Sequence, residues 1–325
     1  MNELFNGIHK IVLPFQSPLN HVNVYLIEGE ELTLIDAGVN SSQAWSELEF
    51  QINSLGYKVT DIKNIVITHH HPDHIGLLDY FSHDVKVFGH SYNESWINDY
   101  KNLQMHFNKF INHHIKAYGI PDGFKKTLIK KETEGVASTK KITNFLTEGQ
   151  VLPFLPGFKV LETPGHCSTH ICLYRKTDGL LIGGDLLINN IFLNTFMEPP
   201  MIGSNERPKL LLEYNKSLLR IKNLDINLIY PGHGEEIKEI DLLIDLQFKK
   251  QQKRKKRVMR LLREKPHTIY ELCTKLFVGL YEIQFALALS ETIGIIDLLK
   301  EEKHIVINKT DEVWVCNLNP VPAYF

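Results

Sequence analysis

The stretch that decides the fold is residues 65–76, Ile-Val-Ile-Thr-His-His-His-Pro-Asp-His-Ile-Gly. Its first three residues are apolar and β-branched, which predicts a short buried strand leading directly into a polar cluster. Extended backbone directs the side chains of His69 and His71 to one face, because side chains alternate along a strand. Pro72 favours the start of a helix, so we expect Asp73 and His74 in its first turn, turned away from the histidine pair. Two diverging pairs of metal-binding groups suit two neighbouring metal ions better than one.

Length and composition bound the class of protein. The chain has 325 residues, a hydrophobic fraction of 43%, a net charge of −2 and four cysteines. This length accommodates one large domain and a small one, and the weak net charge gives no overall attraction to nucleic acid or membranes. The cysteines lack paired short spacing, which is typical of packing residues in a reducing compartment. Because no secretory segment or membrane-length apolar run is apparent, we expect a cytoplasmic protein with no membrane contact.

The first 245 residues mix strands and helices. Strands are predicted at 8–13, 22–27, 32–35, 65–67, 85–88, 158–162, 171–174, 180–182 and 227–230, and helices at 42–55, 72–81 and 208–223. This mixture favours a layered α/β domain. Between residues 93 and 148 the sequence predicts long helices in place of short strands. We interpret these helices as a lid inserted over a site.

The remaining residues follow a different order. A long helix is predicted from Leu242, and its basic run at 253–257 indicates a boundary between domains at 1–245 and 246–325. Helices at 268–277 and 281–299 and strands at 305–307 and 313–316, with a hairpin tip at 308–311, follow in the order of a winged helix. Residues 289–294 occupy the place of a recognition helix but carry little positive charge, so a structural or dimerising role suits them at least as well as reading DNA. The basic run is a solvated helix face, with nucleic-acid contact as the functional alternative.

Three later segments share one form, in which a strand ends in a glycine-containing turn that carries a metal-binding side chain. The side chains are those of His166, Asp185 and His233. Glycines allow the backbone to turn sharply and to bring a ligand close to an ion. These turns therefore supply further candidate metal ligands.

Taken together, these residues resemble a known family. The ordered set is His69, His71, Asp73, His74, His166, Asp185 and His233, preceded by Asp36 in Ile35-Asp36-Ala37-Gly38. In this order the set is similar to the metallo-β-lactamase superfamily, in a branch that includes glyoxalase II and an endoribonuclease, and the resemblance covers about residues 8–240. It implies a four-layer αββα sandwich with the site at one edge. The C-terminal pattern resembles the winged-helix module appended to some members of this superfamily, including a mitochondrial endoribonuclease.

The resemblance also implies a ligand set. One metal takes His69, His71 and His166, the other takes Asp73, His74 and His233, and Asp185 bridges both. Nitrogen and oxygen ligands without thiolate suit two Zn²⁺ ions, with iron or manganese as alternatives. Asp36 acts behind a ligand histidine, and we take Asp73 and Asp36 as the catalytic carboxylates. The bridging Asp185 argues against antibiotic hydrolysis, and a histidine at position 71 argues against the diiron flavoprotein branch.

These expectations lead to a function with alternatives. We expect a dinuclear hydrolase in which a metal-bound hydroxide attacks an ester, thioester or similar small anionic substrate. Glyoxalase II-type thioester hydrolysis is the nearest named case, although the C-terminal pattern does not resemble that enzyme's helical domain. The alternatives are a single-stranded RNA endonuclease, a winged-helix DNA-binding regulator with a metal sensing site, and a redox protein with iron. RNA therefore stays open as a partner, as does a homodimer.

Residues near the motifs receive structural interpretations. We expect His70 to point away from the site and pack or form a hydrogen bond, and His170 to orient its loop or pack. Cys167 is interpreted as a small buried filler and Tyr230 as a core residue. The lid histidines, His106, His113 and His114, are expected to be solvated, with contact to substrate as the alternative.

Overall fold

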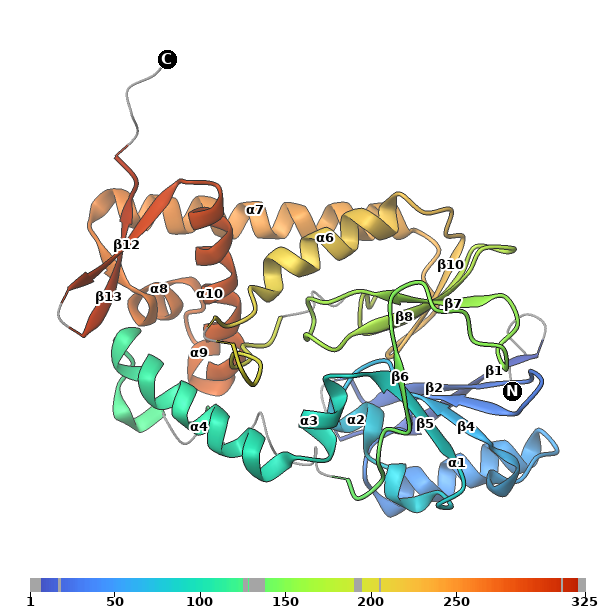
Figure 1. Cartoon of the computed structure of the whole chain (residues 1–325). Helices are drawn as coiled ribbons and strands as arrows, with labels where there is room; N and C mark the ends of the chain where they lie inside the picture. Colours follow the sequence, from blue (N-terminus) through green and yellow to red (C-terminus); the bar gives the residue numbers. More distant parts are fainter. Residues whose placement is uncertain are drawn as a thin grey trace.

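The computed structural model describes residues 7–16, 19–124, 128, 138–189, 195–204, 206–310 and 312–320. Within these residues two β-sheets lie at the centre of the larger part of the molecule, with helices packed around them (Figure 1). The first sheet follows the order β1 (Ile8–Pro14), β2 (His21–Ile27), β3 (Thr33–Ile35), β4 (Asn64–Val66), β5 (Lys86–His90) and β6 (Asn144–Leu146). The second sheet follows the order β10 (Leu228–Pro231), β9 (Leu180–Gly184), β8 (Ile171–Arg175) and β7 (Phe158–Glu162). The predicted α/β class is confirmed.

Buried apolar clusters join the sheets and helices. Between the sheets, Val66 and Phe88 of the first share one cluster with Leu173 and Ile182 of the second. Helix α1 (Ser42–Ser54) covers the outer face of the first sheet (Figure 1). Helices α6 (Leu210–Lys222) and α7 (Ile240–Glu264) cover the outer face of the second. Because both faces of each sheet are covered, the inner strands are apolar along nearly their whole length.

The direction of the strands brings the motif residues to neighbouring edges. Strand β3 pairs in parallel with β4, so Asp36 and His69 follow strands that end at the same edge of the first sheet. In the second sheet β9 pairs in parallel with β10, while β8 is antiparallel to both β7 and β9. Strands β7, β9 and β10 therefore point the same way, and His166, Asp185 and His233 leave the same edge. Ligands commonly bind beyond such strand ends in α/β proteins.

The predicted helix at 72–81 is wrong, because the chain forms two shorter elements. These are α2 (Pro72–Ile75) and the 3₁₀ helix η2 (Leu78–Tyr80). The backbone N–H of Gly76 donates to the carbonyl of Gly38 at 2.7 Å, and that of Leu77 donates to Ala37 at 3.1 Å. A Cβ atom at position 76 would lie 2.1 Å from the backbone nitrogen of Asn40. The turn that carries Asp36 therefore docks on the end of α2 and stops the helix.

The insertion at 93–148 is only partly helical. Helices α3 (Asn93–Ile97) and α4 (Tyr100–Ala117) confirm the helical part, but β6 adds a strand to the first sheet at its end. The N–H of Thr143 donates to the carbonyl of Val87 at 2.8 Å and starts this pairing with β5. Residues 125–127 and 129–137 of the predicted lid lie outside the described residues.

The C-terminal unit contains helices and a small sheet. The helices are α8 (Ile269–Leu276), α9 (Leu280–Ile283) and α10 (Phe285–Glu301), and the sheet order is β11 (His267–Thr268), β13 (Val313–Leu318) and β12 (Ile305–Thr310). The predicted single helix at 281–299 breaks at Gln284, and the chain turns there so that Phe285 is buried while Ile283 is exposed. Strand β11 was not predicted. The predicted hairpin tip at 308–311 is too long, since Asn308 pairs with Val315.

Helix α10 lies inside the molecule rather than on its surface. Residues 289–294, the predicted place of a recognition helix, are all buried. A Cβ atom at Gly294 would lie 2.8 Å from the Cβ of Leu211 in α6, which shows how closely the two helices pack. Glu291 forms an ion pair with Arg254 of α7. This segment therefore does not present its side chains to a DNA groove.

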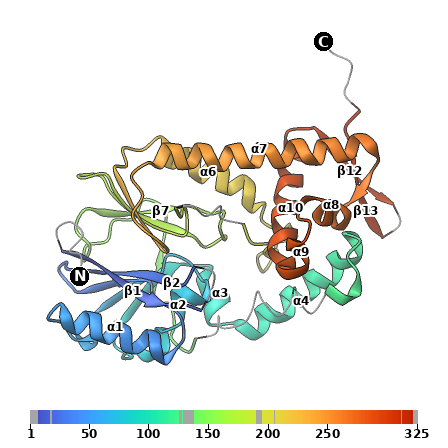
Figure 2. The ribbon, with the colours of Figure 1, turned by 180° about the vertical axis from the view of Figure 1, so that it is seen from behind.

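Helix α7 connects the sheets to the C-terminal unit. It continues without a break across the predicted boundary at residue 245, and both views show it running along one side of the molecule (Figures 1 and 2). Its buried residues share one apolar cluster with α6 and α10. Among the described residues, no helix combines the length and apolar composition needed to cross a bilayer.

Candidate metal centre

Three histidines meet at the first group of candidate ligands. Nε2 of His69 lies 3.0 Å from Nδ1 of His71, and Nε2 of His166 lies 2.9 Å from the same Nδ1 atom. Zinc–nitrogen bonds of about 2.0–2.1 Å place two tetrahedral ligands roughly 3.3 Å apart, close to these separations. The three side chains come from the turns after β4 and β7, which belong to different sheets. The group can hold one ion.

A second group lies beside the first. Oδ2 of Asp73 is 3.2 Å from Nε2 of His233 and 4.0 Å from Nε2 of His74. The expected divergence of the two pairs is only partly right, because the rings of His69 and His74 are in contact, with centroids 4.1 Å apart. The two groups are therefore neighbours.

Asp185 lies between the groups. Its Oδ1 atom is 3.4 Å from Nε2 of His74, while its Oδ2 atom is 3.5 Å from Nε2 of both His166 and His233. One carboxylate thus faces both groups. This is the geometry that a bridging ligand requires, and the structure brings all seven predicted ligands together.

Asp36 orients two histidines from behind. It has a φ of 61°, a left-handed conformation that directs its carboxylate inward. Its Oδ1 accepts the backbone N–H of Thr68 at 2.7 Å, and its Oδ2 accepts the Thr68 hydroxyl at 2.8 Å. The same Oδ2 accepts Nδ1–H of His74 at 2.8 Å. Since the Thr68 hydroxyl donates to Asp36, it accepts Nδ1–H of His69 at 3.0 Å. Asp36 therefore sets the tautomers that leave Nε2 of both histidines free to bind a metal.

Strand β2 holds the turn that carries His233. The side-chain amide of Asn23 donates to the carbonyls of Pro231 and Gly234, and the hydroxyl of Tyr25 donates to Pro231 at 2.7 Å. Nδ1 of His233 donates to the carbonyl of His21 at 2.6 Å, which turns Nε2 toward the cluster. The first sheet thus positions a ligand that belongs to the second.

Gly232, which precedes His233, leaves no room for a side chain. A Cβ atom at Gly232 would lie 2.3 Å from Oδ1 of Asp185 and 2.7 Å from the His74 ring. Only glycine allows the backbone to approach the two side chains this closely.

Three residues next to the candidate ligands, His70, His170 and Cys167, have the structural roles expected for them. Nδ1 of His70 is 2.8 Å from the Thr169 hydroxyl, and its ring stacks on Trp96 with centroids 3.9 Å apart. Nε2 of His170 accepts the backbone N–H of Asp185 at 3.0 Å, so this histidine orients a ligand turn as predicted. Cys167 is fully buried, and burial raises the pKa of its thiol well above the usual value, which disfavours thiolate ligation.

The expectation for the lid histidines is only partly right. His113 is exposed as predicted, but His106 and His114 are half-buried. Nε2 of His106 donates to the carbonyl of Pro200 at 2.6 Å, and the ring of His114 packs near Trp314 of the C-terminal sheet. These contacts are tertiary, and no local pattern in the sequence announces them.

The segment at 195–204 supplies residues that the sequence did not indicate. The ring of Phe196 lies 4.7 Å from that of His71 and 5.5 Å from that of His166, measured between centroids. Glu198 is buried, and its carboxylate accepts the backbone N–H of Ser168 at 2.9 Å. Burial raises the pKa of Glu198 to about 7. The segment thus forms a wall beside the first group of ligands.

Electrostatics prepare the cluster for cations. Burial lowers the pKa of His69 well below its usual value, that of His71 to about 4 and that of His166 to about 3, so all three are neutral near pH 7. Burial opposes ionisation of Asp185, but His233 and His74 hold its pKa well below the usual range. The first ligand group therefore presents neutral imidazoles beside an ionised Asp185, the forms that bind metals.

The donor atoms fit a divalent metal by a second criterion. Nε2 of His74, Nε2 of His233 and Oδ1 of Asp185 are buried atoms without a hydrogen-bond partner among the described residues. Buried polar atoms normally have a partner, and here all three face the centre of the cluster. Among the described residues, four sets of side chains lie close enough to bind one ion together. They are His69/His71/His166, Asp73/His74/His233, His69/His74/Asp185 and His70/His71/Cys167.

Comparisons with known proteins agree with this site. Residues 18–233 match the sequence profile described as "Metallo-beta-lactamase superfamily". The chain is 38% identical over 296 residues to a Bacillus subtilis (strain 168) protein named "Probable metallo-hydrolase YqjP", an alignment that covers 91% of this chain and 92% of that protein. A crystal structure of a metallo-beta-lactamase family protein from Thermus thermophilus is similar with a TM-score of 0.76 and 26% identity, and the match covers 96% of this chain and 98% of that one. The Aspergillus fumigatus protein named "Atrochrysone carboxyl ACP thioesterase" is 23% identical over 247 residues, which are 76% of this chain and 61% of that protein.

The family profile spans most of the sheets, and the relative from Bacillus subtilis extends over nearly the whole chain. Both agree with the cluster of histidines and carboxylates at the ends of the strands. The chain therefore belongs to the metallo-β-lactamase superfamily, and it is a metal-dependent hydrolase.

Proposed function

We propose that this protein is a dinuclear hydrolase that cleaves an ester or thioester of a small anionic acyl substrate. The observation that carries the proposal is the site itself, where two ligand groups share Asp185 beside a wall of apolar side chains. Zinc suits the nitrogen and oxygen donors, and iron or manganese are the alternatives.

Each residue has a distinct task in this proposal. His69, His71 and His166 would hold one ion, Asp73, His74 and His233 would hold the other, and Asp185 would contact both. When bound, the ions supply Lewis-acid polarisation of the scissile group and activation of a water molecule. Two ionised carboxylates, Asp73 and Asp185, against two divalent ions would leave about two uncompensated positive charges, which would attract an anionic substrate.

Two carboxylates have roles beyond holding charge. The side chain of Asp73 is 13% exposed, against 7% for Asp185, so it is the more accessible carboxylate facing the cluster. We assign it the task of accepting a proton at its outer oxygen as the water is activated. Asp36 is a positioning residue that acts through Thr68 and His74.

The surroundings of the site favour a small acyl group over a polyanion. Phe196 covers the rings of His71 and His166, and Trp96 covers His70. Behind this wall the described residues leave a space of only about 30 Å³, no larger than one water molecule, which is lined by apolar and uncharged side chains with His106 and Glu198 but no Lys or Arg. An apolar wall with few polar groups is typical of sites for small molecules. The name of the Aspergillus fumigatus relative, a thioesterase, supports the thioester class.

The alternative functions have less support near the metal cluster. RNA cleavage would need free cations beside the cluster, whereas Lys10, which donates to the carbonyl of Gly234 next to His233, is paired with Glu235 and Glu236. A DNA-reading regulator would need an exposed recognition helix, whereas residues 289–294 are buried. We propose that residues 1–245 form the αββα sandwich and that residues 246–325 form a winged-helix module in which residues 289–294 have a structural role.

The test measures thiol release from short acyl thioesters by the zinc-loaded protein, with Asp185→Asn as the inactive variant and His83→Ala as the control. His83 is an exposed histidine outside the cluster. We expect kcat/KM to fall at least 10³-fold for Asp185→Asn and to stay unchanged for His83→Ala, because only Asp185 contacts both ligand groups. Cleavage of labelled single-stranded RNA without any thioester or ester hydrolysis would overturn the proposal.

A further inference from the structure

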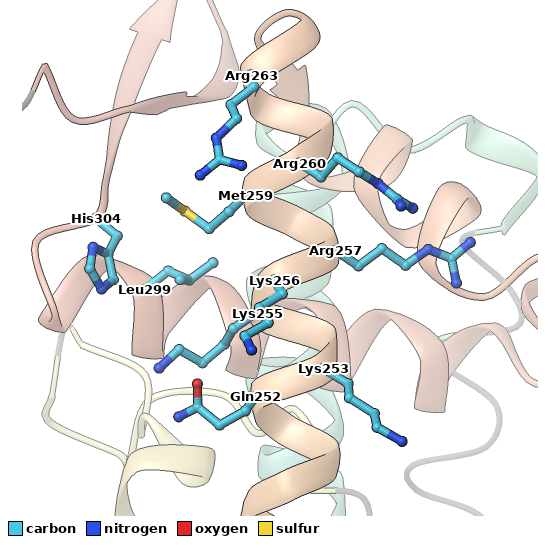
Figure 3. Close-up of a pocket in the computed structure, with 10 residues that line it drawn as sticks. All are labelled: Gln252, Lys253, Lys255, Lys256, Arg257, Met259, Arg260, Arg263, Leu299 and His304. Carbon is cyan, nitrogen blue, oxygen red and sulfur yellow. The ribbon is translucent and has the colours of Figure 1, made fainter.

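A basic groove runs along the C-terminal half of α7 (Figure 3). It has a volume of about 740 Å³, and none of its lining residues belongs to the candidate metal centre. Six of the lining side chains are cations of α7, namely Lys253, Lys255, Lys256, Arg257, Arg260 and Arg263. Figure 3 shows them on both sides of the exposed ridge of the helix. The net charge of −2 for the whole chain makes this local excess notable.

Four of the six cations have neither an ion pair nor a hydrogen bond among the described residues. Lys255 is half of an ion pair with Glu302, and Arg257 donates to the backbone carbonyls of Lys275 and Leu276. The others, Lys253, Lys256, Arg260 and Arg263, are exposed and have no carboxylate within 4.0 Å in the part of the chain that the structure describes.

Helix stability does not explain this row of charges. Cations stabilise the C-terminal end of a helix, but the effect is confined to the last turn, so it accounts for Arg263 and not for Lys253 or Lys256. Residues 246–263 contain no Asp or Glu, so the row has no carboxylate within it, and Glu264 at its end can pair with Arg260 alone at a spacing of four residues. Like charges three or four residues apart instead destabilise a helix by about 0.2–0.5 kcal/mol per pair. The row therefore indicates an anionic ligand.

We propose that the groove binds the phosphate backbone of single-stranded nucleic acid. From Lys253 to Arg263 the helix rises about 15 Å, at about 1.5 Å per residue. A stacked strand rises about 3.4 Å per phosphate, so this length matches about four phosphates, the number of free cations. Met259, Leu299 and the ring of His304 line the same groove and offer apolar and planar surface to sugars and bases.

The packing of α7 favours a single strand over a duplex. A helix that enters the major groove of a duplex must protrude, and α7 instead packs against α6, α8, α10 and β13. The four free cations follow one another along the exposed face of the helix, so they offer charge to one backbone. This inference does not rest on the proposed hydrolase function, because the groove shares no residue with the metal cluster.

The test is fluorescence anisotropy with the full-length metal-loaded protein and labelled 12-nucleotide single strands of RNA and DNA, whose integrity is verified on a gel afterwards. Four phosphate contacts predict a slope of about −0.7 per contact in log affinity against log salt, so affinity falls roughly 50-fold between 50 and 200 mM NaCl. The variant Lys253→Gln/Lys256→Gln/Arg260→Gln/Arg263→Gln is expected to bind at least tenfold more weakly at 50 mM and to lose most of the salt dependence. Since its side chains are exposed, it folds as the parent does.

The matched control removes four exposed lysines elsewhere: Lys63→Gln/Lys86→Gln/Lys176→Gln/Lys238→Gln. It has the same change in net charge and is expected to bind within threefold of the parent. Equal binding by the two fourfold variants would overturn the proposal. Tighter binding of the duplex, or of inorganic polyphosphate, than of the single strands would also overturn it.

Discussion

The substitution Asp36→Asn tests how the residues behind the ligands control the metal centre. Asp36 accepts three hydrogen bonds: from the backbone and hydroxyl of Thr68 at 2.7 and 2.8 Å, and from Nδ1 of His74 at 2.8 Å. An asparagine of the same size keeps one acceptor oxygen and places an NH₂ group where Oδ2 lies. That NH₂ group can donate to the Thr68 hydroxyl and to Nδ1 of His74, so both bonds reverse. The Thr68 hydroxyl then donates to Nδ1 of His69.

Reversal moves protons onto the wrong atoms. His69 and His74 each become protonated at Nε2, the nitrogen that faces the other candidate ligands. Loss of such supporting partners typically lowers metal affinity 10–100-fold, which is about 1.4–2.8 kcal/mol. Because His69 belongs to the first ligand group and His74 to the second, both affinities are expected to fall.

The assay is a competition titration of Zn²⁺ against a chelator, with Asp79→Asn as the control. Oδ1 of Asp79 accepts hydrogen bonds from Ser138, Thr139 and Lys140. Like Asp36, this carboxylate accepts several hydrogen bonds, but it lies away from the metal cluster. Asp79→Asn is expected to lose thermal stability and keep both zinc affinities. If Asp36→Asn binds zinc as tightly as the parent, or if the two variants weaken it equally, the reasoning about the tautomers is refuted.

Three further predictions concern the same centre. Despite burial, nearby carboxylates raise the pKa of His233 to about 10 and that of His74 well above its usual value in the metal-free protein. Each histidine then holds a proton at pH 7, so zinc binding should release about two protons and should tighten as the pH rises. Calorimetry in two buffers that detects no proton release would contradict this prediction. Gly232→Ala places a methyl group 2.3 Å from Oδ1 of Asp185, so zinc affinity should fall at least tenfold. The control Gly123→Ala should leave zinc affinity unchanged, because no atom lies within 4 Å of the added methyl group. Tyr25→Phe removes a buried hydrogen bond of 2.7 Å to the turn of the last ligand and should cost about 1 kcal/mol of unfolding free energy in urea; an unchanged midpoint would show that this bond does not hold the turn.

The sequence was sufficient for the strands and for the cluster because both depend on local patterns. Residues 65–67 are apolar and β-branched, and strand β4 covers Asn64–Val66. The side chain of Ser41 accepts the N–H of Ala44 at the start of α1, a capping interaction between near neighbours in the sequence. The candidate ligands follow strands, so the direction of the strands was enough to bring them together.

The sequence was insufficient wherever a distant segment decides the local structure. The helix at 72–81 stops because the backbone of Gly38 accepts the N–H of Gly76. Residues 144–146 form a strand because β5 offers an open edge. Glu198 reaches Ser168 across 30 residues, and no periodic pattern links such positions. The burial of α10 follows from its packing on α6 and α7, which its own helical pattern does not reveal.

The most direct test of the central claim is the metal content of the purified protein, measured by inductively coupled plasma mass spectrometry. We expect about two divalent ions per chain for the parent and for His83→Ala, since the seven candidate ligands form two groups. We expect about one ion for His166→Ala, which removes a ligand of the first group, and about one for His233→Ala, which removes a ligand of the second. A parent protein that hydrolyses its substrate with no bound metal, or a His233→Ala variant that keeps both ions, would contradict the central claim.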